Sequence, residues 1–568
     1  MTKVAPAGPA VSLVHTRFEV RWTRFSVVVS LAMALNIVSM VCSFHSILPT
    51  PSVWPMKAYL TEQLPWRGDN TPYPVYDSYA AFSASYLAEN QARFNRSTLL
   101  HQRSYYVDDA TRTDVIRVAL DMRRRTHDDC IDFLLGLPGL IFYGGNMRRF
   151  LCDFAASPRG LNGTDDQRWH QRGVCQYGLF AGTTVGKQCI WLTTGDDLTQ
   201  DDAPGVFTLT FIFQLPRFYV WLWVKFGYRC LISLYVCFEM WREYYRHCTH
   251  LCAIVQRFGH TVPTPTSLAW QYDLVMGDPT ALILLDPVVS AAFTLDVWLS
   301  MEYMGIAMVR ATQIADLYTL FLAFMYFSRT VWFAYLALSV SSKVLKRFAK
   351  EHVFAGVDPT VVAICVAVYV VPVDYLQANT RIVNAYYWLF RVPASRDTQD
   401  EQVDVLLGCV LLTISIALFP VLYGVARSRC RSTPALSSRR AAYSSQAYNG
   451  VKARLVLFVL RRFRRRDRQA LAFGGTLYAV FEANPRYKRY PTISLRSVDC
   501  FLVCKSHGVP KQMIRLSLLR SLDCHPTNPH LTITDGSTES VVNVLDRIEC
   551  TGTSFCIHRG IARTAWCM

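Results

Sequence analysis

The sequence has little charge for its length and lacks recognisable catalytic signatures. Only 18% of its 568 residues are charged, whereas 51% are apolar, and the mean hydropathy is +0.17. This composition favours a protein embedded in a membrane over a set of soluble domains. The G-x-S-x-G, Walker, protein-kinase, H-E-x-x-H and dinucleotide-binding motifs are missing from the sequence. The sequence therefore gives no support to an enzyme, and it predicts no cofactor.

Acidic residues are in deficit, and paired metal-binding motifs are missing. The chain has 42 acidic and 59 basic residues, which gives a formal net charge of +17. No RNA- or DNA-binding signature accompanies this charge, so we expect anionic lipids rather than nucleic acid as partners. A solvated basic face is the alternative. The Cys and His residues at 247–252 and 500–567 do not follow the C-x2-C spacing of structural zinc, so we predict no metal site and reduced, packed cysteines.

Long apolar runs dominate the rest of the chain. They lie at residues 25–48, 206–228, 280–300, 314–338, 359–378 and 403–426. Each is close to the roughly 20 residues that a transmembrane helix needs. The first run exceeds the apolar core of a cleaved signal peptide, which has about 7–15 residues. We interpret it as an uncleaved signal-anchor after a cytosolic segment at 1–24, with a cleaved signal as the alternative. Together the runs predict an α-helical multispan membrane protein with about six transmembrane helices, five of them in a membrane domain at 206–426.

Basic residues between these runs predict the orientation. They are Arg242, Arg246, Arg257, Lys343, Lys346, Arg347, Lys350, Arg427, Arg429 and Arg431. With a cytosolic N-terminus, all of them fall on the cytosolic side, as the positive-inside rule requires, and both termini are cytosolic. The region 206–244 is ambiguous and could span once or twice. One span agrees better with the charges, with Lys225 and Arg229 reaching toward the membrane surface.

The segment between the first two runs, residues 49–205, has the features of an ectodomain outside the cytosol. The two Asn-x-Ser/Thr sequons of the chain without proline lie here, at Asn95 and Asn162. The segment also contains four cysteines, which predict two disulfide bonds with three possible pairings: Cys130, Cys152, Cys175 and Cys189. We predict a glycosylated, mixed α/β ectodomain, with a helix at 111–125 and strands at 140–145 and 187–194.

The chain after the sixth run divides into a linker and a domain. Residues 427–473 form a basic, Ser- and Arg-rich linker that ends in an apolar-then-basic helix. Five arginines of that helix are candidates for binding anionic inner-leaflet headgroups: Arg461, Arg462, Arg464, Arg465 and Arg466. An ordinary basic helix of the next domain is the alternative. Residues 474–568 predict a small cytosolic α/β domain, with strands at 476–483, 499–504 and 531–536 and a helix at 510–522.

Four charged residues fall within or beside the third and fourth runs: Asp286, Asp296, Arg310 and Arg329. A charged aspartate at mid-bilayer costs about 2.5–3.5 kcal/mol on insertion scales. Residues at comparable depths in the two expected transmembrane helices can form ion pairs. This predicts two pairs between the helices, Asp286 with Arg329 and Asp296 with Arg310. We favour a structural role for these pairs. A proton or ion relay, and simple placement at the membrane surface, are the alternatives.

The tripeptide Asp-Pro-Thr occurs twice, at 278–280 and 358–360. An aspartate N-cap followed by proline at the first helical position accounts for both copies, so we predict two helix starts. An internal transporter-like repeat is the weaker interpretation.

Several strings between residues 218 and 504 resemble a group of multipass membrane proteins from oomycetes. They are "WVKFGYRCLISLYVCFEMWREYYRH", "MGDPTALILLDP", "LDVWLSMEY", "SRTVWFAY" and "NPRYKRYPTISLRSVDCFLVC". The resemblance covers about half of the chain and implies a multispan membrane protein without catalytic residues.

The sequence as a whole leads to one expected function and one alternative. We expect a non-enzymatic, multipass membrane glycoprotein that binds, adheres or signals through an unknown protein partner. Its location would be the plasma membrane or a secretory-pathway membrane. The alternative is a transporter or ion channel that uses the four charged residues of the third and fourth runs.

Overall fold

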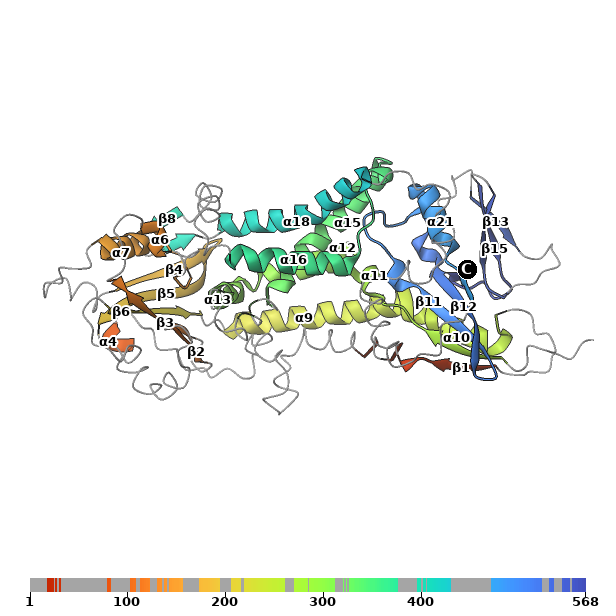
Figure 1. Ribbon diagram of the computed structural model, residues 1–568, viewed down its shortest axis with the longest axis horizontal. Helices are drawn as coiled ribbons and strands as arrows, with labels where there is room; N and C mark the ends of the chain where they lie inside the picture. Colours follow the sequence, from red (N-terminus) through yellow and green to blue (C-terminus); the bar gives the residue numbers. More distant parts are fainter. Residues whose placement is uncertain are drawn as a thin grey trace, which may run out of the picture.

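The computed structural model shows an elongated molecule with β-sheets at both ends and helices between them (Figure 1). The described residues lie within 18–31, 79–82, 103–122, 130–156, 173–194, 206–260, 270–311, 320–375, 396–430, 471–523, 531–535 and 544–568, with short gaps inside several of these ranges. We call the three parts the seven-stranded end, the helical section and the C-terminal end.

The seven-stranded end is built on one sheet with the order β2-β3-β6-β5-β4-β9-β8. Its strands are β2 (Arg103–Asp108), β3 (Thr113–Asp121), β4 (Val174–Phe180), β5 (Thr183–Thr194), β6 (Val206–Gln214), β8 (Arg396–Gln399) and β9 (Gln402–Asp404). Neighbouring strands are antiparallel except β4 and β9, which are parallel. The last two strands come from a part of the chain almost 200 residues after the others. The sheet therefore contains both β6, the strand before the first helix of the helical section, and β9, the strand before its last helix.

Apolar side chains on both faces of this sheet are covered by helices. On β6, Phe207 and Phe211 face a core that α6 (Cys130–Leu134) and α7 (Gly145–Ala156) cover. Ile212 faces the other side and packs with residues of β5 and of α4 (Tyr79–Phe82). Successive side chains of a strand point to opposite faces, so a run that is apolar throughout fits a strand buried on both faces.

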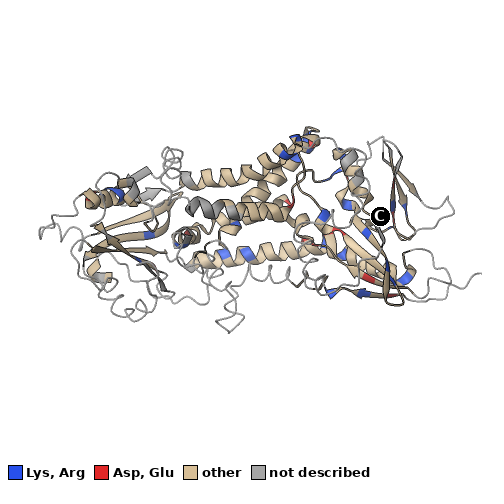
Figure 2. Ribbon diagram, viewed as in Figure 1, with Lys and Arg blue, Asp and Glu red and all other residues tan. Residues whose placement is uncertain are grey.

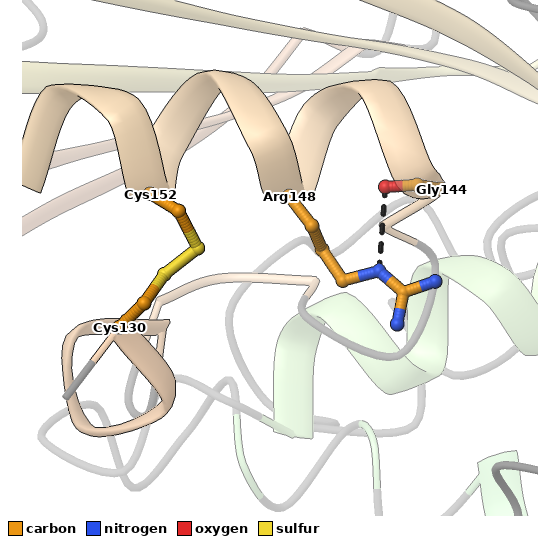
Figure 3. The surroundings of a disulfide bond; sticks show 4 residues. All are labelled: Cys130, Gly144, Arg148 and Cys152. Carbon is orange, nitrogen blue, oxygen red and sulfur yellow. Dashed lines mark hydrogen bonds between the residues drawn. A yellow bond between two sulfur atoms is a disulfide. The ribbon is translucent and has the colours of Figure 1, made fainter.

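Two disulfide bonds confirm the expected oxidised cysteines at this end. Cys130 of α6 is bonded to Cys152 of α7, and Arg148 in the same helix donates from Nε to the Gly144 carbonyl oxygen at 3.4 Å (Figure 3). Cys175 of β4 is bonded to Cys189, which lies directly opposite on β5. The first bond joins two helices to each other, and the second fixes the register of a strand pair.

The helical section contains α9 (Tyr219–Met240), α12 (Pro287–Trp298), α15 (Val331–Arg347), α16 (Pro359–Tyr375) and α18 (Leu406–Arg429). A π-helix (Trp241–Tyr245) joins α9 to α10 (Arg246–Phe258), and the short α11 (Thr280–Leu284) precedes α12. Helix α13 (Met301–Ala311) turns toward the seven-stranded end, where Gly305 lies against the Phe213 ring. Both α9 and α18 run from the seven-stranded end toward the C-terminal end (Figure 1).

The C-terminal end combines strands from three distant parts of the chain. Its six-stranded sheet contains β1 (Glu19–Trp22), β7 (Trp270–Val275), β10 (Leu471–Gly474), β11 (Cys500–Ser506), β12 (Val509–Leu518) and β16 (Trp566–Cys567). Helix α21 (Thr476–Ala483) lies beside it, and a smaller sheet contains β13 (Leu531–Asp535), β14 (Arg547–Thr551) and β15 (Ser554–Arg559). The Trp566 indole donates to the His247 carbonyl oxygen at 3.0 Å, which attaches this end to α10.

The predicted α-helical protein with about six transmembrane helices is wrong. The described residues form a mixed α/β protein with three sheets. Among them, two helices are long and apolar enough to cross a membrane, Val220–Phe258 and Cys409–Arg429. Most of the first apolar run, from residue 32 onward, lies outside the described residues.

A helix break explains why the run at 280–300 falls short. The run at 280–300 is divided, because α11 ends at Leu284 and Asp286 caps a new helix that begins at Pro287. That second helix has 12 residues and ends at Trp298. Helix α16 is described over 17 residues, Pro359–Tyr375, and the rest of the run at 359–378 lies outside the described residues. An apolar composition alone did not reveal the break at Asp286.

The run at 206–228 contains two kinds of element. Its first part is the strand β6, and its helix α9 begins only at Tyr219, after Pro216. The strand has the sequence VFTLTFIFQ, in which β-branched and aromatic residues favour strands. Proline then prevents a continuous helix from covering the whole run.

Local predictions at the two ends are partly confirmed. The strands expected at 187–194, 499–504 and 531–536 are present as β5, β11 and β13. The helices expected at 111–125 and 510–522 are wrong, since β3 and β12 occupy most of these ranges. The strand expected at 476–483 is also wrong, because this segment is α21. In each case the tertiary packing overrides a short periodic pattern.

Candidate functional site in the helical section

A charged cluster lies in the helical section around the carboxylate of Asp296. The Arg229 Nε atom on α9 donates to Asp296 Oδ1 at 2.7 Å, and Arg329 donates to Oδ2. Asp296 is 2% exposed. Arg229 also donates to the Ser300 hydroxyl at 2.9 Å, and Arg329 donates to the Tyr326 hydroxyl at 3.0 Å. Both carboxylate oxygens of a buried aspartate are therefore held by guanidinium groups from different segments.

A second ion pair lies one turn earlier on α9. The Lys225 Nζ atom is 2.5 Å from Glu302 Oε1, and it lies over the Tyr303 ring, 4.8 Å from its centroid. The Lys225 side chain is 2% exposed. Lys225 and Arg229 are four residues apart, so they share one face of α9 and both point inward. The sequence predicted instead that both side chains reach outward to a membrane surface, and this prediction is wrong. Their i, i+4 spacing was the signal that could have revealed a shared inward face.

The remaining predicted charges are joined differently from the expected pairs. Arg310 lies 3.6 Å from Asp114 of β3, so it connects α13 to the seven-stranded end. Asp286 accepts hydrogen bonds from the amides of Val288 and Val289 and caps α12. Of the four predicted residues, the structure brings together only Asp296 and Arg329.

The two Asp-Pro-Thr motifs cap helices, as predicted. The Thr280 amide donates to Asp278 Oδ1 at 3.0 Å, and the Thr360 amide donates to Asp358 Oδ1 at 2.8 Å. Helix α16 begins directly after Asp358, and α11 begins at Thr280, two residues after Asp278. Both carboxylates thus satisfy amides that have no partner within the helix.

The C-terminal end contains a separate buried ion pair. The Arg515 Nε atom donates to Asp499 Oδ2 at 2.6 Å, and the Tyr478 hydroxyl lies 3.1 Å from Oδ1. Burial raises the pKa of the Asp499 carboxyl, while Arg515 acts in the opposite direction. Burial also raises the pKa of Tyr478 well above its ordinary value. This pair lies inside the packed sheet region and joins the residue directly before β11 to β12.

Cysteines of the C-terminal end behave as buried apolar groups. Cys500 and Cys504 are fully buried on β11, and burial raises the pKa of the Cys504 thiol to about 12. Such a thiol is protonated at neutral pH and is a poor nucleophile or metal ligand. Within the part of the chain that the structure describes, no group of three or more Cys, His, Asp or Glu side chains could hold a metal ion.

Seven predicted site residues lie outside the described residues. They are the sequon residues Asn95 and Asn162 and the basic residues Arg461, Arg462, Arg464, Arg465 and Arg466. Comparison with protein-family models, with curated proteins and with solved structures finds no match for this chain.

Proposed function

We propose that this chain is a non-enzymatic membrane protein with a binding or signalling role. In this proposal the helical section lies in the bilayer of the plasma membrane or of a secretory-pathway organelle, and α9 and α18 run through it in the same direction. The seven-stranded end then lies outside the cytosol and presents the binding surface, whereas the C-terminal end lies in the cytosol. The resemblance to oomycete membrane proteins is consistent with this proposal and stays a prediction.

The outer surface of the helical section is the observation that carries the proposal. Within Val220–Phe258, only 28% of an apolar stretch of 18 residues is buried. Within Cys409–Arg429, only 17% of such a stretch is buried. Large apolar side chains are exposed along both helices: Val220, Trp223, Val224, Leu231, Leu234, Phe238, Ile414, Leu418, Phe419, Leu422 and Tyr423. A surface of this kind is costly in water and favourable in hydrocarbon.

The distribution of charge supports the same environment. Figure 2 shows the basic residues of α9 in the middle of the molecule, where Lys225 and Arg229 are paired with carboxylates. Helix α18 has no charged residue from Leu406 to Ala426, and its arginines come only at its end. Charges that are paired inside and missing outside are what a helix in hydrocarbon requires.

The state of the cysteines supports the proposed sidedness. At the seven-stranded end, the four described cysteines form disulfide bonds. At the C-terminal end, Cys500, Cys504 and Cys556 are free thiols. Disulfides persist in oxidising compartments and are rare in the cytosol, so the two ends fit opposite sides of a membrane.

Alkaline extraction of the protein from vesicles tests membrane crossing. We expect the wild-type chain to stay with the lipid, and we expect a variant with Leu231→Ser, Leu234→Ser, Leu418→Ser and Leu422→Ser to be released. A matched variant with Val509→Ser, Ile533→Ser and Ile561→Ser changes exposed apolar residues of the C-terminal end and should stay bound. Release of the wild-type chain would contradict the proposal.

Thiol labelling in sealed vesicles tests the sidedness. An impermeant maleimide should label the exposed Cys430 from one side only. An impermeant reductant should open the Cys130–Cys152 bond only from the other side. Reaction of both groups from the same side would contradict opposite placement of the two ends.

Transport is the second candidate, because the helical section contains buried titratable groups of the type that ion pathways use. The geometry favours the first candidate, since Asp296 already has a guanidinium group on each oxygen. Flux of protons or monovalent cations into vesicles distinguishes the two. Flux that Asp296→Asn abolishes, in a variant that still folds, would establish transport.

A further inference from the structure

A cavity of about 470 Å³, with both charged and apolar side chains in its wall, lies where the helical section meets the C-terminal end. Its walls come from α9, the π-helix, the α11–α12 turn, α15 and the segment around Tyr490. A π-helix widens one turn of an α-helix, and such turns are frequent at functional sites. Here it contributes Arg242, Glu243 and Tyr244 to the wall.

The buried part of the cavity wall is acidic. The Glu239 side chain is 4% exposed, and its Oε2 atom is 2.8 Å from Arg242. Its Oε1 atom is buried and has no hydrogen-bond partner among the described residues. The Tyr235 hydroxyl, one turn earlier on α9, donates a hydrogen bond to this carboxylate, and Oε1 itself still has no donor within hydrogen-bond distance. Asp286 adds a second carboxylate to the wall. A buried acceptor without a partner costs free energy unless a ligand donates to it.

The exposed part of the wall is basic. Lys343 of α15 and Arg489 are exposed, and neither forms an ion pair with a residue that the structure describes. Lys346, by contrast, is held by Asp523 at 2.6 Å. Tyr490 also lines the cavity, with the Arg489 guanidinium over its ring, and burial raises the pKa of its hydroxyl, which remains a hydrogen-bond donor at neutral pH. Exposed ammonium and guanidinium groups together with a hydroxyl are suited to a phosphate.

The surface beside the cavity is apolar. Val340 and Val344 of α15 are 51% and 47% exposed, and Phe238 of α9 and Trp241 are 56% and 54% exposed. Tryptophan and basic side chains at this position resemble the belt that proteins place at the boundary between hydrocarbon and headgroups. A ligand in the cavity therefore has acidic groups at its buried end, basic groups at its exposed end and apolar side chains beside it.

We propose that this cavity binds the phosphoethanolamine headgroup of a phospholipid. The primary ammonium donates to Glu239 Oε1 and faces Asp286, the phosphate lies between Lys343 and Arg489, and the acyl chains extend along the exposed side chains of α15 and α9. The proposal rests on the bilayer placement of α9 proposed above. No covalent step is involved.

The unpartnered carboxylate oxygen provides selectivity between headgroups. A primary ammonium has three N–H donors, whereas the trimethylammonium of choline has none. A site that must satisfy a buried acceptor discriminates against a ligand without the donor. A phosphoglycerol headgroup provides the phosphate but no cation for Glu239 and Asp286. The site should therefore prefer phosphoethanolamine to both of these.

Native mass spectrometry of the full chain in nanodiscs tests the preference. With equal amounts of phosphatidylethanolamine and phosphatidylcholine, we expect about tenfold more retained ethanolamine lipid, as a charged hydrogen bond implies. Glu239→Gln should remove most of this preference, and Arg489→Gln should weaken retention of the ethanolamine lipid. Glu549→Gln, at a side chain 62% exposed on β14, is the matched control and should leave the preference unchanged. Equal retention of both lipids by the wild-type chain would overturn the proposal.

Soluble phosphoethanolamine distinguishes this proposal from the proposed function. Thermal stabilisation of the detergent-solubilised wild-type chain, lost in Glu239→Gln, would support the headgroup chemistry independently of any bilayer. If the chain is retained in vesicles but shows no headgroup preference, the site proposal fails while the membrane proposal stands. If alkaline extraction releases the chain and soluble phosphoethanolamine still binds, the lipid assignment fails and the cavity is a site for the free compound.

Discussion

Arg229 of α9 and Asp296 of α12 are 67 residues apart in the sequence, and their side chains form an ion pair with 2.7 Å between Nε and Oδ1. Arg329, two residues before the start of α15, approaches the same carboxylate from a third segment. One buried aspartate therefore fixes the positions of α9, α12 and the segment before α15 relative to one another. Removal of one partner of such a cluster leaves uncompensated charge inside the protein.

Replacement of Asp296 should destabilise the protein strongly. In Asp296→Ala, two guanidinium groups lose their shared carboxylate, and we expect the free energy of unfolding to fall by about 3–5 kcal/mol. Denaturant unfolding of the detergent-solubilised protein, followed by tryptophan fluorescence, measures the loss.

The exposed pair of Arg21 with Glu19 on β1 provides the matched control. Glu19→Ala removes a carboxylate of the same kind from a solvated site, so its cost should stay below about 1 kcal/mol. Equal effects of the two alanine substitutions would show that Asp296 does not hold the segments together.

The sequence predicted short features well and long ones poorly. Helix starts at Asp278 and Asp358 follow from local chemistry, because an aspartate cap and a following proline act within one turn. The apolar run at 206–228 was predicted as a transmembrane helix, but its first part is the strand β6. A strand that is buried on both faces has the same apolar composition as a membrane helix. Only the covering helices α4 and α7 distinguish the two, and these are contacts made after folding.

The charged residues show the same limit. The depth of the residues within the expected membrane helices predicted that Asp286 would pair with Arg329. Instead, Asp286 caps α12 and Arg329 pairs with Asp296. A break at the start of α12 changes the rotation of all later residues about the helix, so depth alone does not determine which side chains meet. Glu239 was not singled out at all, because its unpartnered oxygen is a property of the folded cavity.

Gly277 provides a test of how the C-terminal end attaches to the helical section. A Cβ atom at this position would lie 2.4 Å from the Ser497 carbonyl oxygen and 2.6 Å from that of Asp499. The Gly277 amide also donates to the Tyr244 hydroxyl at 2.8 Å, so the backbone cannot move away without a loss. We expect Gly277→Ala to lower the free energy of unfolding by roughly 1–3 kcal/mol.

Gly227→Ala is the control for that substitution. Gly227 lies within α9, and a Cβ atom there would meet nothing within 4 Å. Alanine in a helix interior is better than glycine by roughly 0.5–1 kcal/mol, so this variant should be neutral or more stable. Thermal melting of both variants measures the difference, and a stable Gly277→Ala protein would mean that the junction tolerates displacement.

The cross-strand disulfide should contribute measurably to the seven-stranded end. The bond between Cys175 and Cys189 closes a loop with a sequence separation of 14. Closing a loop of about 15 residues is worth about 3 kcal/mol in the chain-entropy account. Combined Cys175→Ala and Cys189→Ala should therefore lower the unfolding free energy by about 2–4 kcal/mol, measured by denaturant unfolding. Cys430→Ala, at an exposed free thiol, should change it by less than about 0.5 kcal/mol.

His260 should make the C-terminal end less stable in mild acid. Burial lowers the pKa of His260, and Arg547 acts in the same direction. Its Nδ1 atom lies 3.3 Å from the Tyr272 hydroxyl, where burial raises the pKa of Tyr272 to about 12, so this hydroxyl stays neutral. Since the folded state binds the proton less tightly than the unfolded chain, stability is complete above the ordinary histidine pKa of about 6.5 and declines as the pH falls below it.

Urea unfolding at pH 7.5 and pH 5 measures this decline. The wild-type protein should lose up to about 1.4 kcal/mol for each unit by which the folded pKa lies below the unfolded one, reduced by solvent screening. His260→Gln cannot take up the proton, so its unfolding free energy should change less between the two pH values. His507→Gln controls for the loss of an imidazole from an exposed turn. If His260→Gln and the wild-type protein lost the same amount, His260 would not be the group that couples proton binding to folding.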